Sequence, residues 1–213
     1  MPNLCGFFAA SRTAADLHGD RASRSAAESR GWAERLSRQA TRLVALALLA
    51  PPAFAAAQGI PFSQRAAVMQ RVGYTDITIE YSRPVARGRT LFGRSGVVRP
   101  GRIWTPGADS ATLLTVSRDV TVEGHPLAAG SYTLWLMVAD SGQPWTLIVS
   151  RAAHVFHVPY PGSALDVLRA PVVPVEGDPM DALAWYFPVV APDSAVLRMQ
   201  WGTTTIPIRI RTK

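Results

Sequence analysis

Two of the chain's four histidines lie three residues apart, in the segment His154-Val-Phe-His157-Val-Pro-Tyr-Pro. Imidazoles at this spacing share one face of a helix, where they could hold a metal, but they point to opposite faces of a strand. The valines and prolines of the segment disfavour a helix. A metal would also need a third ligand, which His125, Asp109 or Asp166 would have to supply. We therefore predict no metal site and no cofactor.

Three arginines follow a predicted strand, in Tyr81-Ser-Arg83-Pro-Val-Ala-Arg87-Gly-Arg89. Pro84 ends the strand, so the guanidinium groups are presented at its exit, where they suit carboxylate or phosphate oxygens. The alternative is that they pair with nearby carboxylates and hold the loop in place. Arg94, Arg99 and Arg102 extend the basic stretch, but no interleaved aromatic residues or nucleic-acid motif accompany it. We expect a small anionic or polar ligand here and no nucleic acid.

A third candidate is Gly101-Arg-Ile-Trp104-Thr-Pro-Gly107-Ala-Asp109-Ser110. Small residues let a backbone approach a ligand closely, and Trp104 has a flat apolar face that can stack on a ring. Asp109 and Ser110 could then form hydrogen bonds to a polar edge of the ligand. The alternative is that Trp104 belongs to the core and Asp109 caps a turn.

Nucleophilic catalysis has no local signature in this chain. There is no Gly-x-Ser-x-Gly elbow and no Ser-x-x-Lys, and the sole cysteine is Cys5. The alternative to a binding protein is a hydrolase that uses Asp109 with His154 or His157 as an acid/base pair. A distance between these groups within hydrogen-bond reach, in an open pocket, would favour the hydrolase.

The elements that must position these residues are short strands. Apolar and polar residues alternate in Asp76–Ser82, where Ile77, Ile79 and Tyr81 share one face. Further strands are predicted at 111–117, 120–122, 130–138, 145–149, 167–175, 184–190, 196–201 and 205–211. Residues 64–72 and 164–168 are the only short helices that we expect. Closely spaced strands with turns between them predict an all-β fold, an antiparallel β-sandwich or flattened barrel of about eight or nine strands.

The first part of the chain does not look like a fold. Residues 36–57 combine basic residues, the apolar run Leu43–Ala50 and small residues before a cleavage site, as in a secretory signal peptide. Residues 1–35 are then a disordered extension or the result of a mis-assigned start, and residues 58–213 form a single β-sandwich domain. Cys5 lies outside that domain, so the mature chain has no disulfide. The chain carries 22 Lys and Arg against 15 Asp and Glu, which is compatible with anionic partners.

Several segments, in order, resemble the family of secreted bacterial proteins called domain of unknown function 2911. They are "RVGYTDITIEYSRPVARGRTLFG", "GRIWTPGADSAT", "VEGHPLAAGSYTLWL", "DVLR" and "LRMQWGTTTIPIRI", and the resemblance covers about residues 62–211. Members commonly carry Trp-Arg-x-Gly-Ala-Asn-Glu-Ala-Thr where this chain has residues 104–112. Here Thr105, Asp109 and Ser110 replace the Arg, Asn and Glu. The resemblance implies export and no established activity, and the departures argue against a catalytic role carried over from the family.

The sequence thus predicts an exported, non-catalytic β-sandwich, periplasmic or secreted, with no membrane span after cleavage. It would bind a small polar or anionic ligand or an envelope protein through loops 83–89 and 104–110. The predicted site residues are Arg83, Arg87, Arg89, Trp104, Asp109 and Ser110.

The export prediction is tested by the N-terminus of the protein recovered after expression in a Gram-negative host. Cleavage after Ala55 or Ala57 would give a chain that begins at Ala56 or at Gln58, since small residues precede both positions. Edman degradation of the periplasmic and medium fractions reads this directly. Recovery of an uncleaved chain from the cytoplasm alone would contradict the prediction.

Overall fold

The computed structural model describes residues 61–212, so the predicted extension and signal segment lie outside the described residues. The regular secondary structure of the described chain is almost entirely strand, and the predicted all-β antiparallel fold is confirmed. The strands are β1 (Gln64–Val72), β2 (Thr75–Arg83), β3 (Ile103–Trp104), β4 (Leu113–Val116), β5 (Val120–Val122), β6 (His125–Leu127), β7 (Gly130–Met137), β8 (Trp145–Ser150), β9 (Asp166–Val172), β10 (Val175–Val190) and β11 (Ser194–Thr212). A short 3₁₀ turn, η1 (Ser163–Leu165), precedes β9.

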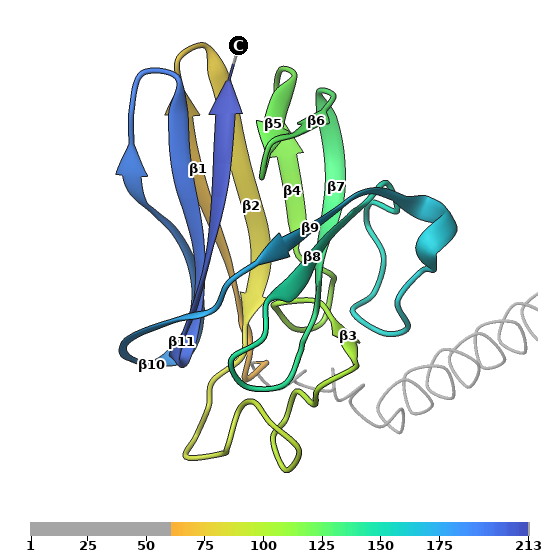
Figure 1. The fold of residues 1–213 in the computed structure, drawn as a ribbon, viewed down its shortest axis with the longest axis vertical. Coiled ribbons are helices and arrows are strands. Elements are labelled where there is room, and N and C mark those ends of the chain that lie inside the picture. Colours follow the sequence, from red (N-terminus) through yellow and green to blue (C-terminus); the bar gives the residue numbers. More distant parts are fainter. Residues whose placement is uncertain (1–60, 213) are drawn as a thin grey trace, which may run out of the picture. The chain divides into compact units, whose positions relative to one another are not determined.

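The strands form two antiparallel sheets, which Figure 1 shows as two layers. The larger sheet has the order β1-β2-β4-β7-β8-β9, and β3 pairs with β7. The smaller sheet has the order β10-β11-β5-β6. One end of the sandwich carries the long connection from β2 to β3 and the β7–β8 hairpin, at the bottom of Figure 1. This end is where the chain has room for binding loops.

The core lies between the two sheets. The alternation predicted for residues 76–82 is confirmed, because Ile77, Ile79 and Tyr81 are buried while Glu80 is exposed. The Tyr81 hydroxyl accepts a hydrogen bond of 3.0 Å from the backbone N–H of Trp185. Since β2 and β10 belong to different sheets, this buried bond links the two layers at the strand end that borders the candidate loops.

The helix predicted at residues 64–72 is wrong, because this segment is strand β1. It pairs in register with β2 along its whole length, from Gln64 opposite Arg83 to Val72 opposite Thr75. Gly73, with φ of 56°, makes the tight turn between the two strands. Ala66 and Val68 pack against the core from alternate positions. Pairing and burial thus override the helix propensity of the alanines, methionine and glutamines.

The predicted strands at 196–201 and 205–211 are one strand, β11, which does not break at the intervening Gly202. Gly202 has φ of 60° and lies opposite Met180, at an irregularity in the β10–β11 ladder. A Cβ atom at Gly202 would lie 2.8 Å from Leu91 Cδ1, so the long β2–β3 connection passes directly against this point. Residues 175–190 also form one strand rather than parts of two, and β3 and β6 were not predicted as strands.

The predicted helical turn at residues 164–168 is shorter than expected, since it ends at Leu165 and Asp166 already begins β9. Within residues 61–212 the model contains no helix of the length and apolar character needed to cross a membrane.

Candidate functional site

The loop between Trp104 and Leu113 is fixed by two buried threonines. The Thr105 hydroxyl donates to the carbonyl oxygen of Leu134 at 2.9 Å and accepts the Thr112 N–H at 3.0 Å. The Thr112 hydroxyl donates to the Pro106 carbonyl oxygen at 2.8 Å. That same oxygen accepts the indole N–H of Trp185 at 3.0 Å. Because both threonine side chains are fully buried, these bonds are shielded from water and hold both ends of the loop.

Gly107 allows the threonine bonds to form. A Cβ atom at this position would lie 2.7 Å from the Thr112 Oγ1 atom, closer than side chains approach one another. The loop therefore needs glycine here because of close packing rather than because of an unusual backbone angle. The residues that follow, Asp109 and Ser110, project from this fixed base and are exposed.

A second loop, residues 151–162, crosses the outer face of the larger sheet. Val155 and Tyr160 pack against a small cluster formed by Ala111, Trp135 and Ile148, which lies on the opposite side of the sheet from the main core. The two rings of Trp135 and Tyr160 meet edge to face, with centroids 5.4 Å apart. This burial gives the loop a defined position although it contains no strand.

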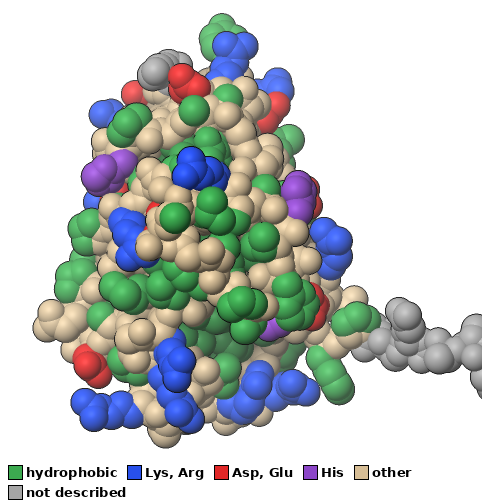
Figure 2. All heavy atoms as spheres, turned by 90° about the vertical axis from the view of Figure 1, so that its right-hand side faces the viewer, with side chains coloured by type: hydrophobic (Ala, Val, Ile, Leu, Met, Phe, Trp, Pro, Cys, Tyr) green, Lys and Arg blue, Asp and Glu red, His purple; other side chains and the backbone are tan. Residues whose placement is uncertain are grey.

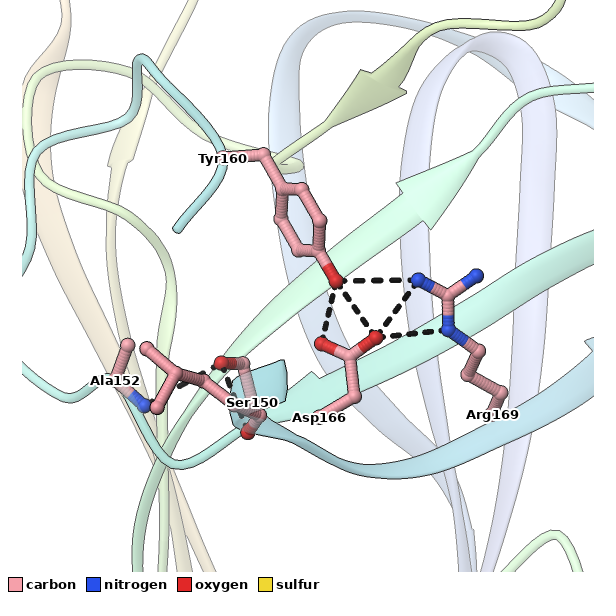
Figure 3. Close-up of polar contacts among 6 residues, drawn as sticks. Ser150, Ala152, Tyr160, Asp166 and Arg169 are labelled. Carbon is pink, nitrogen blue, oxygen red and sulfur yellow. Dashed lines mark hydrogen bonds and ion pairs between the residues drawn. The ribbon is translucent and has the colours of Figure 1, made fainter. Parts of the chain in front are cut away.

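A polar network fastens the far end of the second loop (Figure 3). The Tyr160 hydroxyl lies 2.5 and 2.6 Å from the two carboxylate oxygens of Asp166 and donates to that carboxylate. Arg169 donates to Asp166 through Nε at 2.8 Å and through Nη2 at 2.7 Å. Burial, followed by the hydrogen bond to Asp166, raises the pKa of Tyr160 above its ordinary value. The network ties the loop to strand β9.

The two loops are joined side by side. Ser110 and Phe156 form an isolated antiparallel bridge, and the Ala111 N–H donates to the Val155 carbonyl at 2.9 Å. His157 contacts the carbonyl oxygen of Asp109 twice, through its backbone N–H at 2.9 Å and through Nδ1 at 2.7 Å. A carbonyl oxygen only accepts, so Nδ1 is the protonated ring nitrogen. His157 therefore supports the backbone of Asp109 and does not contact its carboxylate.

The joined loops border a cavity of about 710 Å³ together with the ends of β1 and β2. Its polar lining includes Arg65, Glu80, Ser82, Asp109, Ser110 and His154. We call it the Asp109 cavity. Phe156, which is 61% exposed, supplies an apolar ring at its border. Arg65 and Glu80 approach to 3.6 Å, but both side chains are solvent-exposed and the pair is weak.

The backbone at the Asp109 cavity is in an uncommon conformation. Asp109 has φ of 60° and His154 has φ of 58°, so both are left-handed. Aspartate and histidine adopt this region more readily than most residues, but it still has to be held by the surrounding structure. Two of the four non-glycine residues with positive φ in the described chain line this one cavity. The threonine bonds on one side and the Tyr160 network on the other supply that support.

The arginines predicted as ligand contacts are occupied by the protein itself. Arg83 donates through Nε to the Leu183 carbonyl at 2.9 Å, and Arg89 donates to two carbonyl oxygens of its own loop at 2.9 and 2.7 Å. The Arg87 guanidinium lies 4.6 Å from the centre of the Phe62 ring. None of these three arginines lines the Asp109 cavity. The alternative that they hold the loop in place describes their contacts, and a ligand role for them stays a prediction.

Trp104 also lies apart from the Asp109 cavity. Its ring stacks on Trp201, with centroids 5.9 Å apart and an interplanar angle of 19°, and it meets Phe92 edge to face. It packs against the main core and is only partly exposed. Of the six predicted site residues, the structure thus brings Asp109 and Ser110 together with His154. Among the described residues, no group of three metal-ligating side chains comes together.

Sequence reasoning did not assign a site role to Arg65, Glu80, Ser82 or Phe156, all of which line the Asp109 cavity. Ser82 could have been found, because it lies at the end of a predicted strand, beside the candidate loop that begins at Arg83. Arg65 was hidden by the incorrect helix at residues 64–72, which removed β1 from the sheet. Phe156 could be found only once the loop containing it was placed beside residues 109–111.

These features define a two-sheet, all-β protein with a polar cavity built from strand ends and two fixed loops. Residues 63–210 match the model of the family described as "protein of unknown function (DUF2911)". The chain therefore belongs to the domain of unknown function 2911 family, which confirms the resemblance. Neither the curated proteins nor the solved structures with which the chain was compared include a match.

Substitution of Tyr160 by Phe tests the polar network at the end of the second loop. We expect a loss of about 1–2 kcal/mol in the free energy of unfolding near pH 7, since a hydrogen bond to a charged carboxylate is removed. The folded state retains the Tyr160 proton to higher pH than the unfolded chain. The contribution of this proton to the free energy of unfolding is therefore present below about pH 10. It is lost as the pH rises from there through the folded-state pKa of Tyr160.

Urea unfolding of the wild-type protein and Tyr160→Phe, followed by circular dichroism from pH 7 to 11, measures both effects. The difference between the two proteins should shrink above about pH 10. Tyr132→Phe is the control, because the Tyr132 hydroxyl donates to a backbone carbonyl and not to a carboxylate. A difference that stays constant across this range would show that titration of Tyr160 does not contribute.

Proposed function

We propose that this protein is an exported binding protein that takes a small hydroxylated ligand, such as a sugar, in the Asp109 cavity. The observation that carries the proposal is the convergence of Asp109, Ser110 and His154 on one cavity, from two loops that are each fixed by their own buried contacts. Groups held in advance in a binding geometry lower the entropy that a ligand must overcome.

The chemistry of the lining supports a hydroxylated ligand. Asp109 and Glu80 are acceptors, Arg65 is a donor, and the hydroxyl groups of Ser82 and Ser110 can do both. Sugar hydroxyls likewise both donate and accept. The exposed ring of Phe156 offers an apolar surface of the kind on which the C–H face of a sugar packs. A volume of about 710 Å³ lies within the range of small-molecule sites.

Export and a periplasmic or secreted location form part of the proposal. They are supported by the signal-like segment at residues 36–57 and by the absence of cysteine from residues 58–213. An exported protein would meet its ligand in the envelope or the medium.

A hydrolase is the second candidate, because Asp109, Ser110 and His154 line the same cavity. The contacts favour binding over hydrolysis. Within residues 61–212, the only imidazole with a hydrogen bond to Asp109 is that of His157, and its partner is the backbone carbonyl rather than the carboxylate. No hydrogen bond within the described residues joins the Ser110 hydroxyl to a histidine, as an activated nucleophile would require.

The binding proposal is tested by titrating isotope-labelled protein with neutral hexoses, amino sugars, uronic acids and a methyl glycoside, each at up to about 10 mM. We expect saturable shifts in the amide signals of Ser110, Ala111, His154 and Val155 with at least one probe. Asp109→Asn should weaken binding of that probe about fivefold or more, because the left-handed backbone is retained while the charged acceptor is lost. Ser110→Ala should weaken it less.

Ser141→Ala is the matched control, because Ser141 is an exposed serine in the β7–β8 hairpin and does not line the Asp109 cavity. Binding that is unchanged in Asp109→Asn and in Ser110→Ala would contradict the assignment of the cavity. The appearance of product signals from the methyl glycoside over hours, abolished by His154→Gln, would instead establish the hydrolase.

A further inference from the structure

A second cavity, of about 600 Å³, lies at the loop end of the sandwich, and the proposed function does not use it. Its walls come from the β2–β3 connection, the β7–β8 hairpin, the start of β10 and residues Thr203 and Thr204 of β11. We call it the Phe92 cavity. Several arginine side chains lie along this lower end of the molecule in Figure 2.

One wall of the Phe92 cavity is aromatic. Phe92 belongs to the β2–β3 connection. The centroid of its ring lies 5.1 Å from the centroid of the Trp145 ring and 6.1 Å from that of the Trp201 ring. The connection is held by a hydrogen bond of 2.8 Å from the Val98 N–H to the Leu91 carbonyl, and Leu91 lies against Gly202. Pro100, Pro174 and Val175 add further apolar surface. The wall is thus fixed and suits an apolar side chain of a ligand.

One flank of the Phe92 cavity carries excess positive charge. Arg94, Pro100 and Asp140 line both this cavity and a neighbouring shallow hollow of about 400 Å³, which Arg99 also borders. This flank therefore carries two guanidinium groups and one carboxylate. Unlike Arg83 and Arg89, neither Arg94 nor Arg99 makes an ion pair or side-chain hydrogen bond with another described residue. Their donors remain available to a carboxylate on a ligand.

The other flank carries a negative charge. Glu176 lines the cavity beside Thr204, its partner in the β10–β11 ladder. Thr204 also borders a further cavity that neither Arg94 nor Arg99 lines, and Glu176 does not line the Arg94 hollow. Glu176 has no ion pair or side-chain hydrogen bond with another described residue. Its carboxylate is available to a cationic group.

We propose that the Phe92 cavity binds a short peptide with free termini. The aromatic wall takes an apolar side chain, Arg94 and Arg99 bind the terminal carboxylate, and Glu176 binds the terminal ammonium group. Free positive and negative groups around one apolar wall match a zwitterion with an apolar body, and they disfavour a simple anion. The volume of about 600 Å³ lies within the range of small-molecule sites, in which a peptide of about two residues falls.

The test uses three probes that differ only at their ends: the dipeptide Leu-Phe, its N-acetyl derivative and its C-terminal amide. Isothermal titration calorimetry with the full mature chain should give a Kd of about 1 mM or tighter for the free dipeptide. Each capped probe should bind about fivefold more weakly or worse, since each loses one charge-assisted contact.

Two variants identify which terminus of the dipeptide binds the arginines and which binds Glu176. Arg94→Gln should weaken the binding of the free dipeptide and of the N-acetyl probe about fivefold and leave the binding of the amide unchanged. Glu176→Gln should weaken the binding of the free dipeptide and of the amide and leave the binding of the N-acetyl probe unchanged. Both residues are exposed, so the fold should not be affected, and circular dichroism verifies this.

Arg118→Gln is the control variant, because Arg118 is an exposed arginine in the β4–β5 turn, beyond the strand ends opposite to the cavity. Asp109→Asn should also leave dipeptide binding unchanged, which separates this proposal from the sugar site. Absence of saturable binding, or variants that weaken all three probes alike, would overturn the proposal.

Discussion

The Pro106 carbonyl oxygen is the point on which the Asp109 cavity depends. It accepts the Thr112 hydroxyl from one side and the indole N–H of Trp185 from the other, in a part of the protein closed to water. Buried polar groups left without partners are costly, so these bonds allow little freedom to the chain between residues 105 and 112. The position of Gly107 and the left-handed backbone of Asp109 follow from that restriction.

The second side of the Asp109 cavity is also a loop fixed by buried contacts, but these contacts are of another kind. Residues 151–162 are fixed by an apolar contact with Trp135 and by the carboxylate of Asp166, which accepts hydrogen bonds from Tyr160 and Arg169. Neither loop depends on regular secondary structure of its own. Each is fixed against the larger sheet, and their mutual hydrogen bonds then set the distance between them. A β-sandwich can in this way present a defined site on loops.

The sequence predicted the strands of the larger sheet well, because alternation in a half-buried strand is directly visible in residues such as Ile77, Ile79 and Tyr81. It failed at β1, whose alanines and glutamines carry no such signal and become a strand only through pairing with β2. Asp109 and Ser110 were found from their loop, and the sequence placed Asp109 with His154 or His157 only as the hydrolase alternative. Asp109 and His154 are separated by more than forty positions, and they line one cavity because the two loops pack together.

The arginines show a further limit of sequence reasoning. Arg83 and Arg94 lie in one basic stretch, yet the first donates to a backbone carbonyl and the second has no such partner among the described residues. Only the fold separates an arginine that supports a loop from one that is available to a ligand. The functional reading of a basic segment therefore has to be made residue by residue.

Amide hydrogen exchange of Thr112→Val tests most directly whether the buried threonine fixes the site. The substitution keeps the shape and removes the hydroxyl that bonds Pro106. We expect the amides of Ala111 and His157, which bond across the two loops, to exchange about tenfold faster or more, while the amide of Leu147 in the central sheet stays protected. Unchanged exchange at Ala111 and His157 would show that the loop holds its position without this bond and would contradict the account.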